Sequence, residues 1–209
     1  MGCGSSLGRY VWNPFRDREN TSYMTPMKRT RQLEQLAAET SKKSDQEQIQ
    51  LAQDLTRQIQ AEQDPLMREH LLTTIAALDT PLTGSVLQAA LRDEVPTVRQ
   101  RAVELIAAHQ TTNAVGILAE VVKADEDLDV RLAATRELGR FKDRVAIEAV
   151  ASGLDDDDPA MRFRTMESLA KMTDEDLGLN VVAWKQYLRG GPTGDEPQVA
   201  EKLRSLSPF

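Results

Sequence analysis

Apolar residues recur at helical spacing from about residue 44 to residue 173. Four times, a Met or Val begins a stripe of small or aliphatic residues that continues three or four and seven to eight positions later, which is typical of an amphipathic helix. A second short apolar stretch precedes each stripe. The pattern predicts four pairs of short helices, over about 44–79, 82–109, 113–141 and 143–172.

The second helix of each pair begins with nearly the same motif. Its four copies are Asp64-Pro-Leu-Met-Arg68, Val95-Pro-Thr-Val-Arg99, Asp127-Leu-Asp-Val-Arg131 and Asp158-Pro-Ala-Met-Arg162. The arginines are 31, 32 and 31 residues apart. Asp is a good N-cap and Pro suits the first helical position, so the motif predicts where each helix begins. One pair alone cannot bury its apolar face, and stacked pairs share one core. The predicted fold is therefore all-α, an α-solenoid.

The D-P-x-V-R-x-x-A-x-x-x-L pattern resembles HEAT repeats, in the short form also found in bacterial phycobilisome-lyase-like proteins. The resemblance covers roughly residues 44–173. It implies four HEAT-like helix pairs of the armadillo type, whose extended surfaces bind other proteins.

The segments outside the repeats predict two capping helices and two tails. Residues 25–43 form an N-terminal helix and connector, with Thr25 as its cap. Residues 174–189 form a C-terminal capping helix, in which Trp184 covers the last apolar face. We expect a flexible leader over 1–24, and a disordered tail over 190–209, where Gly and Pro are frequent.

Composition and charge exclude several classes of protein. The net charge of −7 divides into +4 over residues 1–43 and −11 over the remainder, which opposes nucleic-acid binding. One Cys cannot form an internal disulfide or a zinc cluster. His70 and His109 lack metal-ligand spacing. The sequence therefore predicts no metal, no cofactor and no catalytic residues.

Two sets of polar residues are candidates for a function of the solenoid. The repeated arginines, Arg68, Arg99, Arg131 and Arg162, predict a structural ladder that ties neighbouring repeats together. The exposed, concave face of the second helices predicts a groove for a protein or peptide partner. Its candidate residues are Arg101, Glu104, Arg136, Arg164 and Glu167. Their mixed charge favours a protein partner.

The N-terminus carries a candidate lipid-attachment site. The chain begins Met1-Gly-Cys-Gly-Ser-Ser6, and Cys3 is its single cysteine. The segment resembles the end of a bacterial lipoprotein signal peptide, although no charged and apolar regions precede it. Myristoylation of Gly2 is the alternative. Basic and aromatic residues in the leader suit a membrane interface.

Together these features predict a non-catalytic interaction scaffold that is anchored to a membrane, as a bacterial cell-envelope lipoprotein. The alternatives are a cytoplasmic location and a bilin-lyase-like accessory enzyme or chaperone. The scarcity of His, Cys and aromatic residues in the repeats counts against the enzyme. A HEAT-like DNA-repair glycosylase would need a basic groove, which the acidic body opposes.

Overall fold

The computed structural model describes residues 25–111 and 113–190, and all regular structure in these ranges is helical. The predictions for the leader (1–24) and for nearly all of the tail (190–209) fall outside the described residues. The first half contains α1 (Pro26–Glu39), η2 (Thr40–Lys42), α2 (Asp45–Ala61), α3 (Pro65–Ala76), α4 (Pro81–Ala90) and α5 (Pro96–His109). The second half contains α6 (Ala114–Ala124), α7 (Leu128–Leu138), α8 (Arg144–Ala151), η3 (Ser152–Asp155), α9 (Pro159–Thr173) and α10 (Val181–Leu188).

The second helices begin where the repeated motif predicts. The side chains of Asp64, Asp127 and Asp158 each accept a hydrogen bond from a backbone amide of the first turn. Val95 stands at the same position before α5 and makes no side-chain cap. The predicted caps are thus confirmed, and so is the exception in the second copy.

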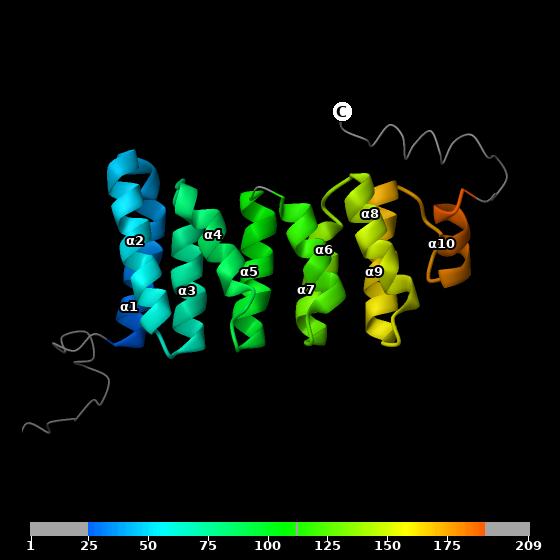
Figure 1. Cartoon of the computed structure of the whole chain (residues 1–209), viewed down its shortest axis with the longest axis horizontal. Coiled ribbons are helices and arrows are strands. Elements are labelled where there is room, and N and C mark those ends of the chain that lie inside the picture. The colour runs from blue at the N-terminus through cyan, green and yellow to red at the C-terminus, as the bar shows by residue number, and fades with distance from the viewer. Residues whose placement is uncertain (1–24, 112, 191–209) are drawn as a thin grey trace, which may run out of the picture.

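The helices form two rows that run along one axis (Figure 1). In one row the second helices α3, α5, α7 and α9 pack successively, and α1 packs on α3 at the start of this row. In the other row lie the first helices, with α2 packed on α4 and α6 packed on α8. The array is an α-solenoid, and α1 takes the place of a second helix from a preceding pair.

Two clusters of buried apolar residues lie between the rows, a smaller one where α1, α2 and α3 meet and a larger one that forms the core of the remaining array. Ala102 and Ala134, on adjacent second helices, are fully buried, and their small side chains let α5 and α7 approach closely. The core extends from Leu72 to the last helix. There Trp184 is fully buried, and its indole Nε1 donates to the carbonyl of Gly178 at 3.0 Å. Trp184 therefore covers the end of the core, as the sequence predicts.

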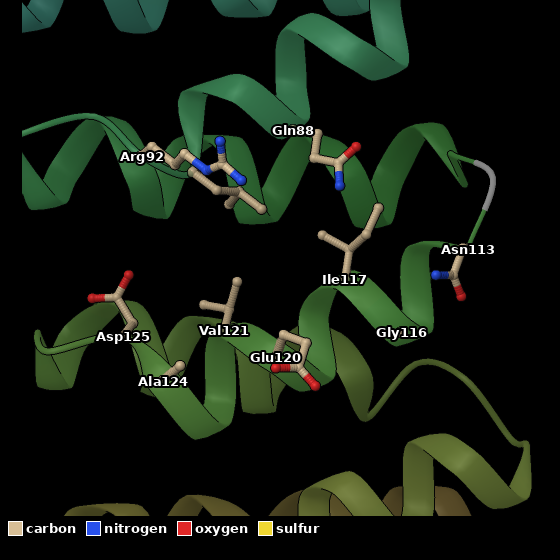
Figure 2. Close-up of a pocket in the computed structure, with 10 residues that line it drawn as sticks. Gln88, Arg92, Asn113, Gly116, Ile117, Glu120, Val121, Ala124 and Asp125 are labelled. Atoms are coloured by element: carbon tan, nitrogen blue, oxygen red, sulfur yellow. The ribbon is translucent and has the colours of Figure 1, made fainter.

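The row of first helices is interrupted once. Helices α4 and α6 make at most marginal contact, although each packs closely on the second helix that follows it. An open groove lies between them, and α5 runs behind it (Figure 2).

Candidate functional site

Two of the four repeated arginines form bidentate ion pairs with aspartates of the following repeat. Arg68 donates from Nε and Nη2 to the carboxylate of Asp93, at 2.8 and 2.7 Å. Arg99 makes the same two bonds to Asp125, both at 2.9 Å. All four side chains are largely buried. Hydrogen bonds donated to these aspartates raise the pKa of Arg68 and of Arg99, so both guanidinium groups stay charged.

The remaining guanidinium nitrogen of each arginine binds the chain just before its own helix. Nη1 of Arg99 donates to the carbonyl of Asp93 at 2.9 Å, and Nη1 of Arg131 donates to the carbonyl of Asp125 at 3.1 Å. Each aspartate therefore contacts one arginine through its carboxylate and the next arginine through its carbonyl. Since the carboxylate also accepts the amide two residues later, it orders the turn into the second helix. The result is a hydrogen-bonded chain that crosses the first two repeat boundaries.

The arginines at the two ends of this hydrogen-bonded chain have different partners. Arg131 reaches Asp156 only at 3.9 Å, through a single nitrogen. Arg162 donates to the carbonyls of Asp156 and Asp157, and no carboxylate of the described residues pairs with it. At the other end, Arg29 of α1 pairs with Glu62. We call these five arginines and their acidic partners the arginine ladder, which thus begins one step before the first predicted rung.

A second set of charges lies across α5 and α7, on the second-helix face. Glu104 accepts from Arg101 at 3.0 Å and from Arg136 at 2.9 Å, so it joins two repeats. Arg136 also pairs with Glu137, which in turn pairs with Arg140. The structure brings together three of the five residues predicted for partner binding.

The other two predicted residues form a separate pair on α9. Arg164 donates to Glu167 at 2.8 Å. The side chains of all five residues are between 32% and 42% exposed. They are therefore neutralised by one another and still within reach of a partner.

The groove between α4 and α6 encloses about 540 Å³. One wall comes from the end of α4, and the other comes from the length of α6. It is lined by Gln88, Leu91, Arg92, Asn113, Gly116, Ile117, Glu120, Val121, Ala124 and Asp125. Figure 2 shows Arg92 on one wall and Glu120 on the other. This groove was not predicted from the sequence, because it depends on how far apart two helices pack.

The two histidines belong neither to the arginine ladder nor to the lining of the groove. His70 is in α3 and His109 is the last residue of α5, and both are half-buried. Among residues 25–111 and 113–190, no three His, Cys, Asp or Glu side chains gather where they could hold a metal ion. Within the same residues, no helix is both long and apolar enough to cross a membrane.

Comparison with known families identifies the repeats. The family model described as HEAT repeats matches residues 52–135 and 115–179, which together exceed half of the chain. This chain belongs to the HEAT-repeat family. No curated protein matches it. The HEAT repeats of this protein extend over the groove and over the arginine ladder except Arg29, and they are typical of scaffolds for protein interaction.

Two elements of this HEAT-repeat protein were detectable in the sequence but were not predicted. The acidic partners Glu62, Asp93, Asp125 and Asp156 follow one another at 31, 32 and 31 residues, the same spacing as the arginines. Thr25-Pro-Met-Lys-Arg29 has the same form as the repeated motif. It lies 39 residues before the next arginine instead of 31 or 32, because α2 is longer than the other first helices.

Proposed function

We propose that this HEAT-repeat protein is a non-catalytic scaffold that binds a protein or peptide partner along its second-helix face. The observation that carries the proposal is the cluster of Arg101, Glu104 and Arg136. It spans α5 and α7 and presents both signs of charge at partly exposed positions. A partner with complementary charges can exchange its own ion pairs for these at little cost in stability, since exposed pairs contribute only about 0–1 kcal/mol each.

Simultaneous replacement of Arg101, Arg136 and Arg164 by Ala tests this proposal. We expect capture of the partner by the full-length chain, measured by quantitative mass spectrometry, to weaken, while the melting temperature changes little. Glu137 keeps Arg140 as a partner in this variant, so no buried carboxylate is left alone.

The matched control replaces three exposed cations of the first helices, Arg57, Lys123 and Arg144, by Ala. It removes the same charge from the other row. Equal capture by the two triple variants and the unmodified chain would refute a role for the second-helix face. Equal loss in both would indicate dependence on net charge alone.

We further propose that the protein is held at a membrane of a bacterial cell envelope through lipid on Cys3, with lipid on Gly2 as the alternative. The support is the sequence pattern alone, since both residues lie outside the described part. Two acyl chains give stable anchoring where one does not. Mass spectrometry of the N-terminal peptide from the native protein tests the proposal. An unmodified Gly2 and Cys3 would contradict it.

A further inference from the structure

The groove between α4 and α6 is longer than its first hollow. A second hollow of about 370 Å³ shares Leu91, Arg92, Ala124 and Asp125 with it and continues to the turns before α5 and α7. The whole groove follows α6 from end to end. At about 1.5 Å per residue, the 11 residues of α6 give it a length of roughly 16 Å.

Apolar side chains line the centre of the groove. Leu91 from α4 faces Ile117 and Val121 from α6, and all three contribute surface to the hollow. Leu91 and Ile117 are only half-buried, although both pack against the core. In the other pairs of adjacent first helices, α2 packs on α4 and α6 packs on α8, whereas α4 and α6 do not close on each other. This strip therefore offers a place for large apolar side chains of a docked segment.

The charges around the strip are mostly acidic, and Glu94, Glu120 and Glu126 make no side-chain hydrogen bond to any described residue. Glu120 is exposed and has no ion pair within the described residues. Glu94 and Glu126 form the rim, with side chains 86% and 89% exposed. They lie 3.9 and 3.8 Å from arginines that already hold bidentate aspartates. Two cations line the groove; Arg99 is held by Asp125, whereas Arg92 is exposed and makes no side-chain hydrogen bond or ion pair to any described residue.

A complementary occupant is thus a basic segment with large apolar side chains and a single carboxylate. Residues 9–18 of this chain, Arg-Tyr-Val-Trp-Asn-Pro-Phe-Arg-Asp-Arg, have this composition. They contain three arginines for the acidic rim, three aromatic residues for the strip, and Asp17 for Arg92. We propose that residues 9–18 dock into the groove between α4 and α6 of the same molecule.

The segment is close enough along the chain. The groove lies beside α5, which is separated from α1 by α3 alone in the row of second helices. Neighbouring helices pack about 8–10 Å apart, so the groove is roughly 20 Å from α1. The seven residues from Arg18 to Thr25 span up to about 23 Å when extended, at about 3.3 Å each. The proposal depends neither on a partner at the second-helix face nor on lipid at Cys3.

Photo-crosslinking within the full-length chain tests the docking. Trp12→p-benzoyl-phenylalanine places the reactive group at the centre of the segment. After irradiation, we expect crosslinked peptides from the end of α4 and from α6, identified by mass spectrometry. In a mixture of isotopically light and heavy chains, the crosslinks should join residues of one copy. Crosslinks to other helices, no crosslinks, or crosslinks between light and heavy copies would overturn the proposal.

Charge-reversal variants test whether the crosslinks depend on the acidic residues of the groove. Glu120→Lys with Glu126→Lys should lower the crosslink yield about tenfold, a factor that corresponds to about 1.4 kcal/mol. The matched control, Asp79→Lys with Glu148→Lys, reverses two exposed acids away from the groove and should leave the yield unchanged. Equal losses in the two variants would refute site-specific docking.

An exchange of the charges at Arg92 and Asp17 then tests the proposed contact between these two residues. Arg92→Asp should lower the yield, because it places two carboxylates opposite each other, and Asp17→Arg in the same chain should restore it. If the crosslink yield is not restored although circular dichroism shows that both variants are folded, the orientation proposed for the segment is wrong.

Discussion

Replacing Arg99 with Met should destabilise the array far more than the same replacement at Arg162. Met keeps much of the aliphatic stem and removes the guanidinium group. At Arg99 the change leaves the carboxylate of Asp125 buried, at 9% side-chain exposure, without its cation. Removing one partner of a buried ion pair costs about 3–5 kcal/mol. At Arg162 the change removes only hydrogen bonds to two carbonyls in an accessible turn, which cost about 1 kcal/mol.

Urea denaturation followed by far-UV circular dichroism measures both values. A loss of 3–5 kcal/mol is a large part of the roughly 5–15 kcal/mol that stabilises a typical domain. In a chain of this length it lowers the melting temperature by roughly 6–20 °C. We expect the unfolding midpoint of Arg99→Met to fall well below that of Arg162→Met.

A third variant separates the cost of leaving a buried carboxylate unpaired from the cost of lost side-chain packing. Arg99→Met with Asp125→Leu removes both charges, so it should recover much of the stability lost in Arg99→Met. If Arg99→Met costs no more than Arg162→Met, or if the double variant is less stable than Arg99→Met, the reasoning about the buried carboxylate is wrong.

Three further predictions concern other parts of the array. A Cβ on Gly153 would lie 2.2 Å from the Oγ1 of Thr165, a buried hydroxyl without a hydrogen-bond partner in the described residues, so Gly153→Ala should cost about 1–3 kcal/mol. Adding Thr165→Ala should restore most of this loss in the same denaturation assay. Trp184→Ala should cost about 3–5 kcal/mol, because it empties a fully buried site at the end of the core, and thermal melting measures this loss. Hydrogen bonds from the side chain and backbone of Ser44 hold the pKa of Glu47 below its ordinary 4.5. Its contribution is therefore complete above about pH 4.5 and disappears as the pH falls through the lower folded value. An NMR titration of Glu47 should show the lowered pKa, and Ser44→Ala should return it towards 4.5.

The sequence predicted the helices and their register because the signals for both are local. Asp64 and Asp158 cap their helices through amides two residues away, so their role depends only on the neighbouring chain. The apolar period then fixes which face of each helix is buried, as at Leu71 and Ile106. These local rules repeat every 31 or 32 residues, which made the solenoid recognisable.

The features that the sequence did not predict depend on distances between helices. The sequence predicted that Arg68 and Arg99 tie neighbouring repeats together, but the aspartate that pairs with each arginine is set by how one repeat packs on the preceding one. The separation of α4 from α6 arises from the packing of each on the second-helix row, and neither helix encodes it alone. Arg29 was missed for a simpler reason, since the longer α2 shifts it away from the common spacing.

The arginine ladder has a consequence for how such a chain can change its length. Each repeat supplies one guanidinium group to the following repeat and receives one from the preceding repeat on its own aspartate, as Arg99 and Asp93 show for α4 and α5. Duplication of a whole unit therefore adds one cation together with one matching anion. The array can gain or lose a repeat without leaving a charge buried alone, and Arg162 already provides the free position to which another unit could be joined.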